Sequence, residues 1–276
     1  MTDLAAAGDL ETPAHLLRRF EIDVLGVDMD AATVEMSMSL AGMRNPFTGH
    51  PTVAPLGLLV DSANGMSNHY RHRGREWTVS SELAIELSPE GSVVAAADDA
   101  PPVVATARPL GPRDSGSSLS VCTLTCGGVV IGGGTVRSYF VTPDEVNMDE
   151  PEETLVRTER TTLAELMAVE PVPAPDGVWR LRQKVDPFLN NAVGIVNGGI
   201  ASTGLELVAS AAVNTGDAPM RTASVRVNFL RPFYATDQSR YEASPLRVGR
   251  GTAVADAQAI GDDGRPALVA RITAYR

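Results

Sequence analysis

A carboxylate and a pair of glycines share one apolar stretch, residues 190–210, which reads NNAVGIVNGGIASTGLELVAS. A helix that begins at Gly198 would offer unpaired N–H groups and the positive end of its dipole to a bound carbonyl oxygen, and glycine lets such a ligand approach the backbone. Glu206 adds a carboxylate, the group that attacks a carbonyl carbon or activates water. These residue types suit hydrolysis of an activated acyl group.

The spacing decides which carboxylate serves which helix start. Glu206 follows Gly198 by eight residues, which places it ~12 Å farther along the same helix at 1.5 Å rise per residue. It therefore cannot act on a carbonyl held at the start of its own helix. A second, antiparallel helix would solve this, and Asp61 lies in a similar stretch, LGLLVDSANG. We expect two crossed sites: Asp61 beside Gly198, and Glu206 beside the chain near Thr52 and Val53.

An internal repeat supplies the second helix. The corresponding segments are 45–65 and 190–210, SELAIELSPEG and SVRVNFLRPFY, 107–128 and 243–264, and 135–141 and 267–275. Each copy reads as a strand, an Asn-containing loop, one long helix and then several long strands. This order predicts an α+β unit in which a curved antiparallel sheet covers the helix.

The repeat divides the chain into three parts. We expect an N-terminal repeat over residues 1–141, an acidic linker over 142–170 and a C-terminal repeat over 171–276. The linker is polar and shows no alternation of apolar residues, with a short helix expected within 159–169.

The second copy resembles the hotdog-fold acyl-CoA thioesterases, of the PaaI-like and 4-hydroxybenzoyl-CoA thioesterase-like kinds. The resemblance rests on Asn191, on Asn197-Gly198-Gly199 and on Glu206, followed by a strand ending in NFLRP and by VGRG. The family motif commonly reads His-Gly-Gly, with a catalytic Asp or Glu nine residues after the His. The resemblance implies a double hotdog, in which both protomers of the usual dimer are fused in one chain with crossed sites.

The two sites depart from the family motif to different degrees. In the site of Asp61, Asn197 replaces the His, and Asn191 matches a polar family position that helps hold the thioester oxygen. Asn197 can cap the helix, and capping alone also explains its presence. In the other site, TVAP replaces His-Gly-Gly, Pro46 replaces the polar residue, and Pro55 removes one N–H. We therefore favour the site of Asp61.

Family members also carry Ser or Thr near the start of the strand after the helix. Ser80 and Ser224 match this position, although ordinary strand serines explain them equally well. Asp61 and Glu206 have the alternative of being solvated or paired carboxylates. Since apolar residues surround both, burial is expected to raise their pKa values and favour a general-base role.

A coenzyme A substrate would need cations for its phosphates, and arginine suits phosphate. Arg231 before Pro232, together with Arg247 and Arg250, are the candidates, with solvated turn residues as the alternative. No cofactor is expected apart from coenzyme A as part of the substrate.

Composition excludes several other classes. The net charge of −11 disfavours nucleic acid and anionic membranes as partners. No apolar run is long enough to span a bilayer, and the N-terminal residues MTDLAAAGDLETP have no signal-peptide pattern. There is no Gly-x-Ser-x-Gly elbow of an α/β-hydrolase, and GGG at 132–134 predicts a hairpin turn or bulge.

The cysteines and histidines predict no metal site. Cys122 and Cys126 lie four residues apart on one expected strand, ~13 Å apart, which is too far for a disulfide. We expect packed thiols and a cytoplasmic protein. The four histidines show no ligand pattern, and the run HYRHRGRE around His69 and His72 predicts a solvated helix end.

Three functions remain open at this level. The first is an acyl-CoA thioesterase in which Asp61 acts as base or nucleophile. An enoyl-CoA hydratase is disfavoured, because MRNPFTGH has Met43 in place of the expected Asp and His50 two residues too late. A non-catalytic acyl-thioester or lipid-binding protein is the third. The sequence does not define the acyl chain; self-association into a homo-oligomer is expected.

Overall fold

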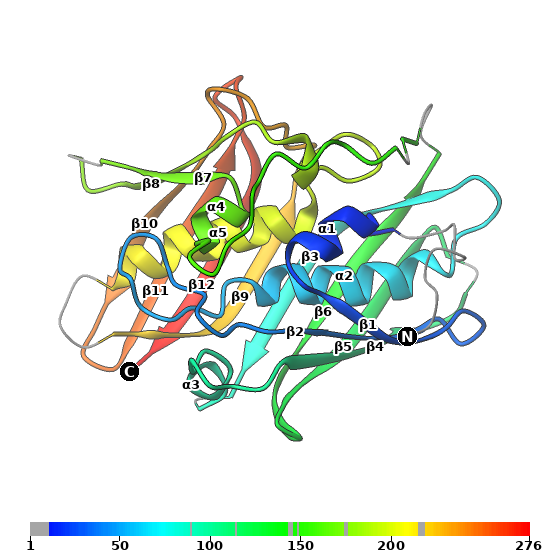
Figure 1. Ribbon diagram of the computed structural model, residues 1–276, viewed down its shortest axis with the longest axis horizontal. Coiled ribbons are helices and arrows are strands. Elements are labelled where there is room, and N and C mark those ends of the chain that lie inside the picture. Colours follow the sequence, from blue (N-terminus) through cyan, green and yellow to red (C-terminus); the bar gives the residue numbers. More distant parts are fainter. Residues whose placement is uncertain are drawn as a thin grey trace.

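Two long helices lie antiparallel and are wrapped by one curved sheet (Figure 1). The computed structural model describes residues 11–88, 90–113, 115–142, 146–147, 149–173, 176–214 and 219–276. The N-terminal residues without a signal-peptide pattern thus lie mostly outside the described residues. Every residue of α2 (Leu56–His69) is buried, as is all of α5 (Gly198–Val213) except its first residue. The two helices therefore form the centre of the core.

Twelve strands of the described chain form one antiparallel sheet in the order β1-β2-β4-β5-β6-β3-β9-β12-β11-β10-β8-β7. In chain order they are β1 (Asp23–Asp28), β2 (Thr33–Met38), β3 (Trp77–Leu87), β4 (Val103–Leu110), β5 (Ser117–Cys126), β6 (Val129–Val141), β7 (Val169–Val172), β8 (Trp179–Gln183), β9 (Arg221–Phe229), β10 (Arg240–Val248), β11 (Thr252–Ile260) and β12 (Pro266–Tyr275).

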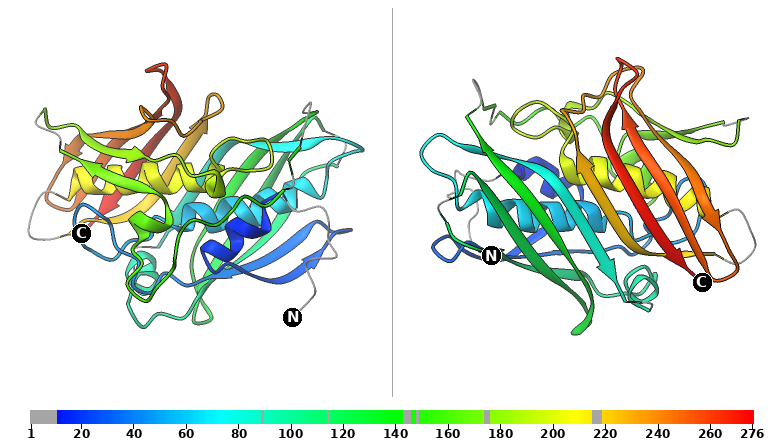
Figure 2. Two further views of the ribbon diagram at one scale, coloured as in Figure 1. Left: turned by 45° about the horizontal axis from the view of Figure 1, so that its top comes forward. Right: turned by 180° about the vertical axis from the view of Figure 1, so that it is seen from behind.

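The two halves of this sheet correspond to the two sequence repeats. Strands β1 to β6 cover α2 and strands β7 to β12 cover α5, with β3 and β9 paired at the centre (Figure 2). The segments matched in the sequence become α2 and α5, β3 and β9, β4 with β5 and β10 with β11, and β6 and β12. The structure therefore has the α+β arrangement that the repeat predicts.

The two helices approach each other through glycine. A Cβ atom on Gly57 would lie 3.2 Å from both Ser202 Cβ and Thr203 N, and one on Gly199 would lie 2.6 Å from Leu58 Cα. Because no side chain separates the backbones there, the N-terminal half of each helix lies against the other. This contact fixes how far the helices overlap.

Of the hairpin turn or bulge expected for the glycines at 132–134, the structure has a bulge-type register shift and no turn. These glycines lie inside β6, beside a register shift in the β5–β6 pairing, whereas the hairpin turn uses Gly127 and Gly128 with positive φ angles of 57° and 79°. A Cβ on Gly134 would lie 2.7 Å from Val60 Cγ1. Gly134 thus lets α2 pack closely on the sheet.

Short helices and an ion-pair cluster hold the outer segments. The short helices are α1 (Ala14–Arg19), α3 (Gly91–Ala95), α4 (Leu163–Leu166) and the 3-10 helix η2 (Pro187–Leu189). Arg19, 4% exposed, pairs with Glu153 of the linker and with Asp186 at 2.5 Å, and lies over the Phe188 ring. The cluster ties α1 and the linker to the loop before α5.

The predicted linker contains the expected helix in shortened form. Thr162 and Glu165 form a reciprocal capping box at the start of α4. Strand β7 begins at Val169, so the last residues of the segment expected as linker join the second half of the sheet.

The cysteine prediction is confirmed, and the one for the histidine run is wrong for its first three residues, which are buried, whereas residues 73–75 are exposed. Cys122 and Cys126 are buried, free thiols on β5. His69 is fully buried, stacks on His72 and contacts the Trp77 ring edge. Charged neighbours in the sequence hid this burial. Among the described residues, no helix has the length and apolarity needed to cross a bilayer.

We predict that Gly199→Ala destabilises the protein by about 1–3 kcal/mol, because the added methyl group would overlap the Leu58 backbone. Urea denaturation measures the change in the free energy of unfolding. Gly26→Ala is the control, since a Cβ there meets nothing within 4 Å. Equal stability of the two variants would show that the helices are not held by this glycine contact.

Candidate active site

A cavity of about 310 Å³ lies where the two repeats meet. Five residues singled out from the sequence line it: Asp61 from α2, Ser80 from β3, Asn191 from the loop before α5, Gly198 at the start of α5, and Arg231 after β9. The carboxylate and the helix start come from different repeats, as the spacing predicts.

Asp61 is buried and held in a defined orientation. Asp61 is only 3% exposed, and Ser80 Oγ donates a hydrogen bond of 2.9 Å to Asp61 Oδ1. Burial raises the pKa of Asp61 to about 6, although hydrogen bonds from Ser80 and the Gly199 backbone act to lower it. The carboxylate is therefore mostly ionised at neutral pH but basic enough to accept a proton.

The start of α5 combines a capped pair of N–H groups with one that has no partner. Asn197 Oδ1 accepts from Gly199 N at 2.9 Å and Ile200 N at 3.3 Å, so Asn197 performs the capping role considered for it. The N–H of Gly198 donates to no acceptor within the described part of the chain. A Cβ on Gly198 would lie 2.8 Å from Asp61 Oδ2. Glycine therefore leaves room between a free donor and the carboxylate.

Asn191 shapes the loop before α5. Its Oδ1 accepts from Val193 N at 3.1 Å and from Ile195 N at 3.2 Å. Because these two hydrogen bonds occupy the side-chain oxygen, the amide nitrogen Nδ2 is the atom that can bind a ligand. The side chain retains a donor for a carbonyl oxygen bound in the cavity that it lines.

The three arginines suggested for phosphate do not come together. Arg231 lines the cavity and pairs with Asp263 at 3.3 Å. Arg247, near the end of β10, and Arg250, in the β10–β11 turn, are exposed. That turn is bonded to the end of β12 through Arg276 N and Gly251 O, whereas Arg231 bonds to Ala267 at the start of β12. Arg231 thus lies at one end of β12, and Arg247 and Arg250 lie near its other end.

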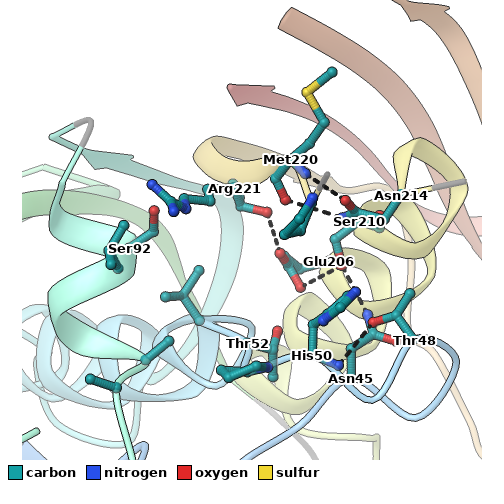
Figure 3. A pocket seen from close by; sticks show the side chains of 17 residues that line it. Asn45, Thr48, His50, Thr52, Ser92, Glu206, Ser210, Asn214, Met220 and Arg221 are labelled. Atoms are coloured by element: carbon teal, nitrogen blue, oxygen red, sulfur yellow. Dashed lines mark hydrogen bonds between the residues drawn. The ribbon is translucent and has the colours of Figure 1, made fainter. Parts of the chain in front are cut away.

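Glu206 lines a second cavity, of about 280 Å³, at the start of α2 (Figure 3). Thr222 Oγ1 donates to its Oε1 at 2.5 Å and Ser210 Oγ donates to its Oε2 at 3.3 Å. Glu206 is 3% exposed, and burial raises its pKa to about 7 against the effect of hydrogen bonds from Thr222, Ser210 and Thr52. The structure thus brings Glu206 to Thr52 and Val53, the positions expected from the repeat.

Thr222, not Ser224, is the hydroxyl partner in this second cavity, which corrects the sequence expectation. The β9–β12 pairing shifts register between Thr273 and Ala274, so Thr273 pairs with Ser224 and Ala274 with Thr222. A similar shift occurs in β3 next to Ser80. The irregularity turns the earlier residue of each strand toward the carboxylate.

The start of α2 resembles the start of α5 in having a capped N–H and, at Val53, one that donates to no acceptor within the described residues, but it differs in its side chains. Thr52 Oγ1 accepts from Ala54 N at 3.2 Å, and Pro55 has no N–H. Val53, with a branched side chain, stands in the place that Gly198 occupies in α5. The two cavities therefore share a buried carboxylate but differ in the helix start that faces it.

Glu11 is a second carboxylate of the first cavity that no sequence pattern indicated. It is 7% exposed and lines the cavity with Asp61. It precedes α1 and lies outside the repeated segments, so no motif marked it. Among the described residues, no group of three His, Cys, Asp or Glu side chains could hold a metal ion.

Comparisons with solved structures identify the fold as a double hotdog. An acyl-CoA thioesterase II TesB2 of Mycobacterium marinum is 14% identical with a TM-score of 0.58, covering 94% of this chain and 96% of that one. A tesB protein of Mycobacterium avium subspecies paratuberculosis is 11% identical with a TM-score of 0.61, covering 94% and 97%. A hot dog fold protein of Alicyclobacillus acidocaldarius is 12% identical with a TM-score of 0.55, covering 91% and 95%.

Residues 189–275 match the family model described as the acyl-CoA thioesterase N-terminal domain. This match confirms the resemblance to the hotdog-fold acyl-CoA thioesterases found in the sequence. No curated protein matches the chain.

We predict that Asp61→Asn stabilises the protein at pH 7.5 by roughly 1–3 kcal/mol. Because burial raises the pKa of Asp61 from 3.8 to about 6, the folded state carries an unfavourable charge above that pH. Stability therefore falls as the pH rises from about 4 to about 6. Denaturation at pH 7.5 and at pH 4 measures the effect. A gain of equal size at both pH values would contradict this origin.

Proposed function

We propose that the protein hydrolyses acyl-CoA thioesters in the cavity of Asp61 and Gly198. One observation carries the proposal: a buried carboxylate from one repeat faces a helix start with a free N–H from the other. These are the two groups that attack on a thioester carbonyl requires. The match of the second repeat to an acyl-CoA thioesterase domain supports the same substrate class.

The start of α5 holds the thioester carbonyl. Its oxygen accepts from Gly198 N–H, and the positive end of the α5 dipole stabilises the negative charge that develops on it. Asn191 Nδ2 provides a second donor. Since these donors are fixed by the loop and by the Asn197 cap, little reorganisation accompanies the reaction.

Asp61 activates water as a general base. The carboxylate removes a proton from water, the oxygen forms a bond to the carbonyl carbon, and collapse of the tetrahedral intermediate breaks the C–S bond. The coenzyme A thiolate then takes the proton from Asp61. A pKa of about 6 keeps Asp61 ionised at neutral pH and within the range that suits this role. The Ser80 hydroxyl fixes the direction of the carboxylate.

Arg231 is proposed to meet a phosphate of the coenzyme A moiety, because it lines the cavity and its side chain is 32% exposed. Its present partner Asp263 lies 3.3 Å away, a weak exposed pair that a phosphate can replace.

The cavity of Glu206 is proposed not to turn over thioesters. Pro55 lacks an N–H, and Val53 fills the position that is glycine at the start of α5. Pro46 also stands where Asn191 stands in the first cavity, so a carbonyl bound there would lack the second, side-chain donor.

We predict that Asp61→Asn lowers kcat/KM for acyl-CoA hydrolysis by about 100-fold or more, because the general base is lost. Glu206→Gln should keep activity within a few-fold of the wild type. Thiol release from short, long and aromatic acyl-CoAs measures both. Loss of activity in Glu206→Gln alone would assign the reaction to the other cavity. Tight binding without turnover by the folded wild type would instead indicate a binding protein.

We predict that kcat/KM of the wild type falls as the pH decreases through about 6, where Asp61 becomes protonated. Ser80→Ala removes a hydrogen bond that lowers this pKa, so the acidic limb should move to higher pH. The matched control is Ser81→Ala, whose hydroxyl donates to Arg137 O instead. An unchanged limb in Ser80→Ala would argue against Asp61 as the titrating base.

A further inference from the structure

Glu11 brings a second carboxyl group into the cavity of Asp61. Glu11 is 7% exposed and lines the cavity. The segment that carries Glu11 leads into α1, and Arg19 anchors α1 through ion pairs with Glu153 and Asp186. Its position in the cavity is therefore set by the fold.

A glycine of α2 provides the seat for this group. A Cβ atom on Gly65 would lie 2.9 Å from Glu11 Oε2 and 3.3 Å from its Cδ. Gly65 follows Asp61 by one helical turn, so Glu11 rests on the same face of α2, ~6 Å farther along the helix.

Glu11 has no cationic partner within the described part of the chain. Thr12 Oγ1 donates to its Oε2 at 3.0 Å, and Arg231 of the same cavity pairs with Asp263. Burial, and then the charge of Asp61, raise the pKa of Glu11 to about 8. When Asp61 is ionised at neutral pH, Glu11 carries a proton and can donate a hydrogen bond.

The cavity wall has exposed and buried parts, and Glu11, 7% exposed, belongs to the buried part. Leu230 and Tyr139 are 56% and 52% exposed, whereas Thr78, which lines the cavity with Glu11, is 1% exposed. Gly198 lies beside Asp61, and Glu11 lies beside Gly65, one helical turn or ~6 Å farther along α2. An acyl chain that starts beside Asp61 and follows α2 therefore reaches Glu11 after about five carbon–carbon bonds.

We propose that Glu11 selects acyl groups that carry a hydroxyl group about five bonds from the thioester carbonyl over plain acyl chains of the same length. This inference rests on the proposed function. A hydroxyl group accepts a hydrogen bond from the buried carboxyl, whereas a hydrocarbon chain offers the carboxyl proton no acceptor. Sites with a buried polar group reject substrates that cannot pair with it.

The test compares hexanoyl-CoA with its 4-, 5- and 6-hydroxy derivatives. The wild type should show a kcat/KM about 10-fold or more higher for at least one hydroxy substrate. Glu11→Leu should abolish this preference, whereas Glu11→Gln, which keeps a donor of similar shape, should retain most of it. Gly65→Ala, which displaces the carboxyl without removing it, should weaken the preference. Glu82→Leu, at an exposed carboxylate of β3, should leave it unchanged.

The outcomes separate this inference from the proposed function. The wild type can require Asp61 and still show equal kcat/KM values for hexanoyl-CoA and all three hydroxy substrates. That result would overturn the selection by Glu11 but not the proposed function. The same holds if Glu11→Leu remains folded by circular dichroism and keeps the preference. Absence of thiol release from every acyl-CoA would overturn the proposed function itself.

Discussion

The close antiparallel contact of α2 and α5 is the constraint on which both cavities depend. Gly57 and Gly199 let the two backbones approach where any side chain would meet the other helix. The overlap sets Asp61 against the start of α5 and Glu206 against the start of α2. A larger separation of the helices would leave each carboxylate buried with no helix start to face.

The sheet wraps this helix pair tightly enough to exclude solvent, so the carboxylates on and beside the helices are buried. Asp61, Glu206 and Glu11 are each under 10% exposed, and none is ion-paired with Lys or Arg in the described part of the chain. Hydroxyl groups from Ser80, Thr222 and Thr12 take that place. Neutral donors orient a carboxylate without abolishing its basicity. A guanidinium in the same place would abolish that basicity, because its positive charge lowers the pKa of the carboxyl group. At these three positions burial lowers the stability of the folded protein and raises the pKa of the carboxyl group.

The repeat and the rise of a helix were enough to predict the crossed pairing of Asp61 with Gly198, because both depend on spacing alone. Thr222 could not be predicted, since a register shift in β9 changes which residue points inward. Arg247 and Arg250 carry the right charge, but the course of β12 separates their turn from Arg231. Glu11 belongs to neither copy of the repeat, and its location depends on tertiary packing around α1.

The match to a thioesterase domain described as N-terminal falls on the repeat that comes second in this chain. Each cavity takes its helix start from one repeat and its carboxylate from the other, and β3 joins β9 directly at the centre of the sheet. Neither repeat alone therefore contains a complete site. A change in one repeat thus reaches both cavities, the helix start of one and the carboxylate of the other.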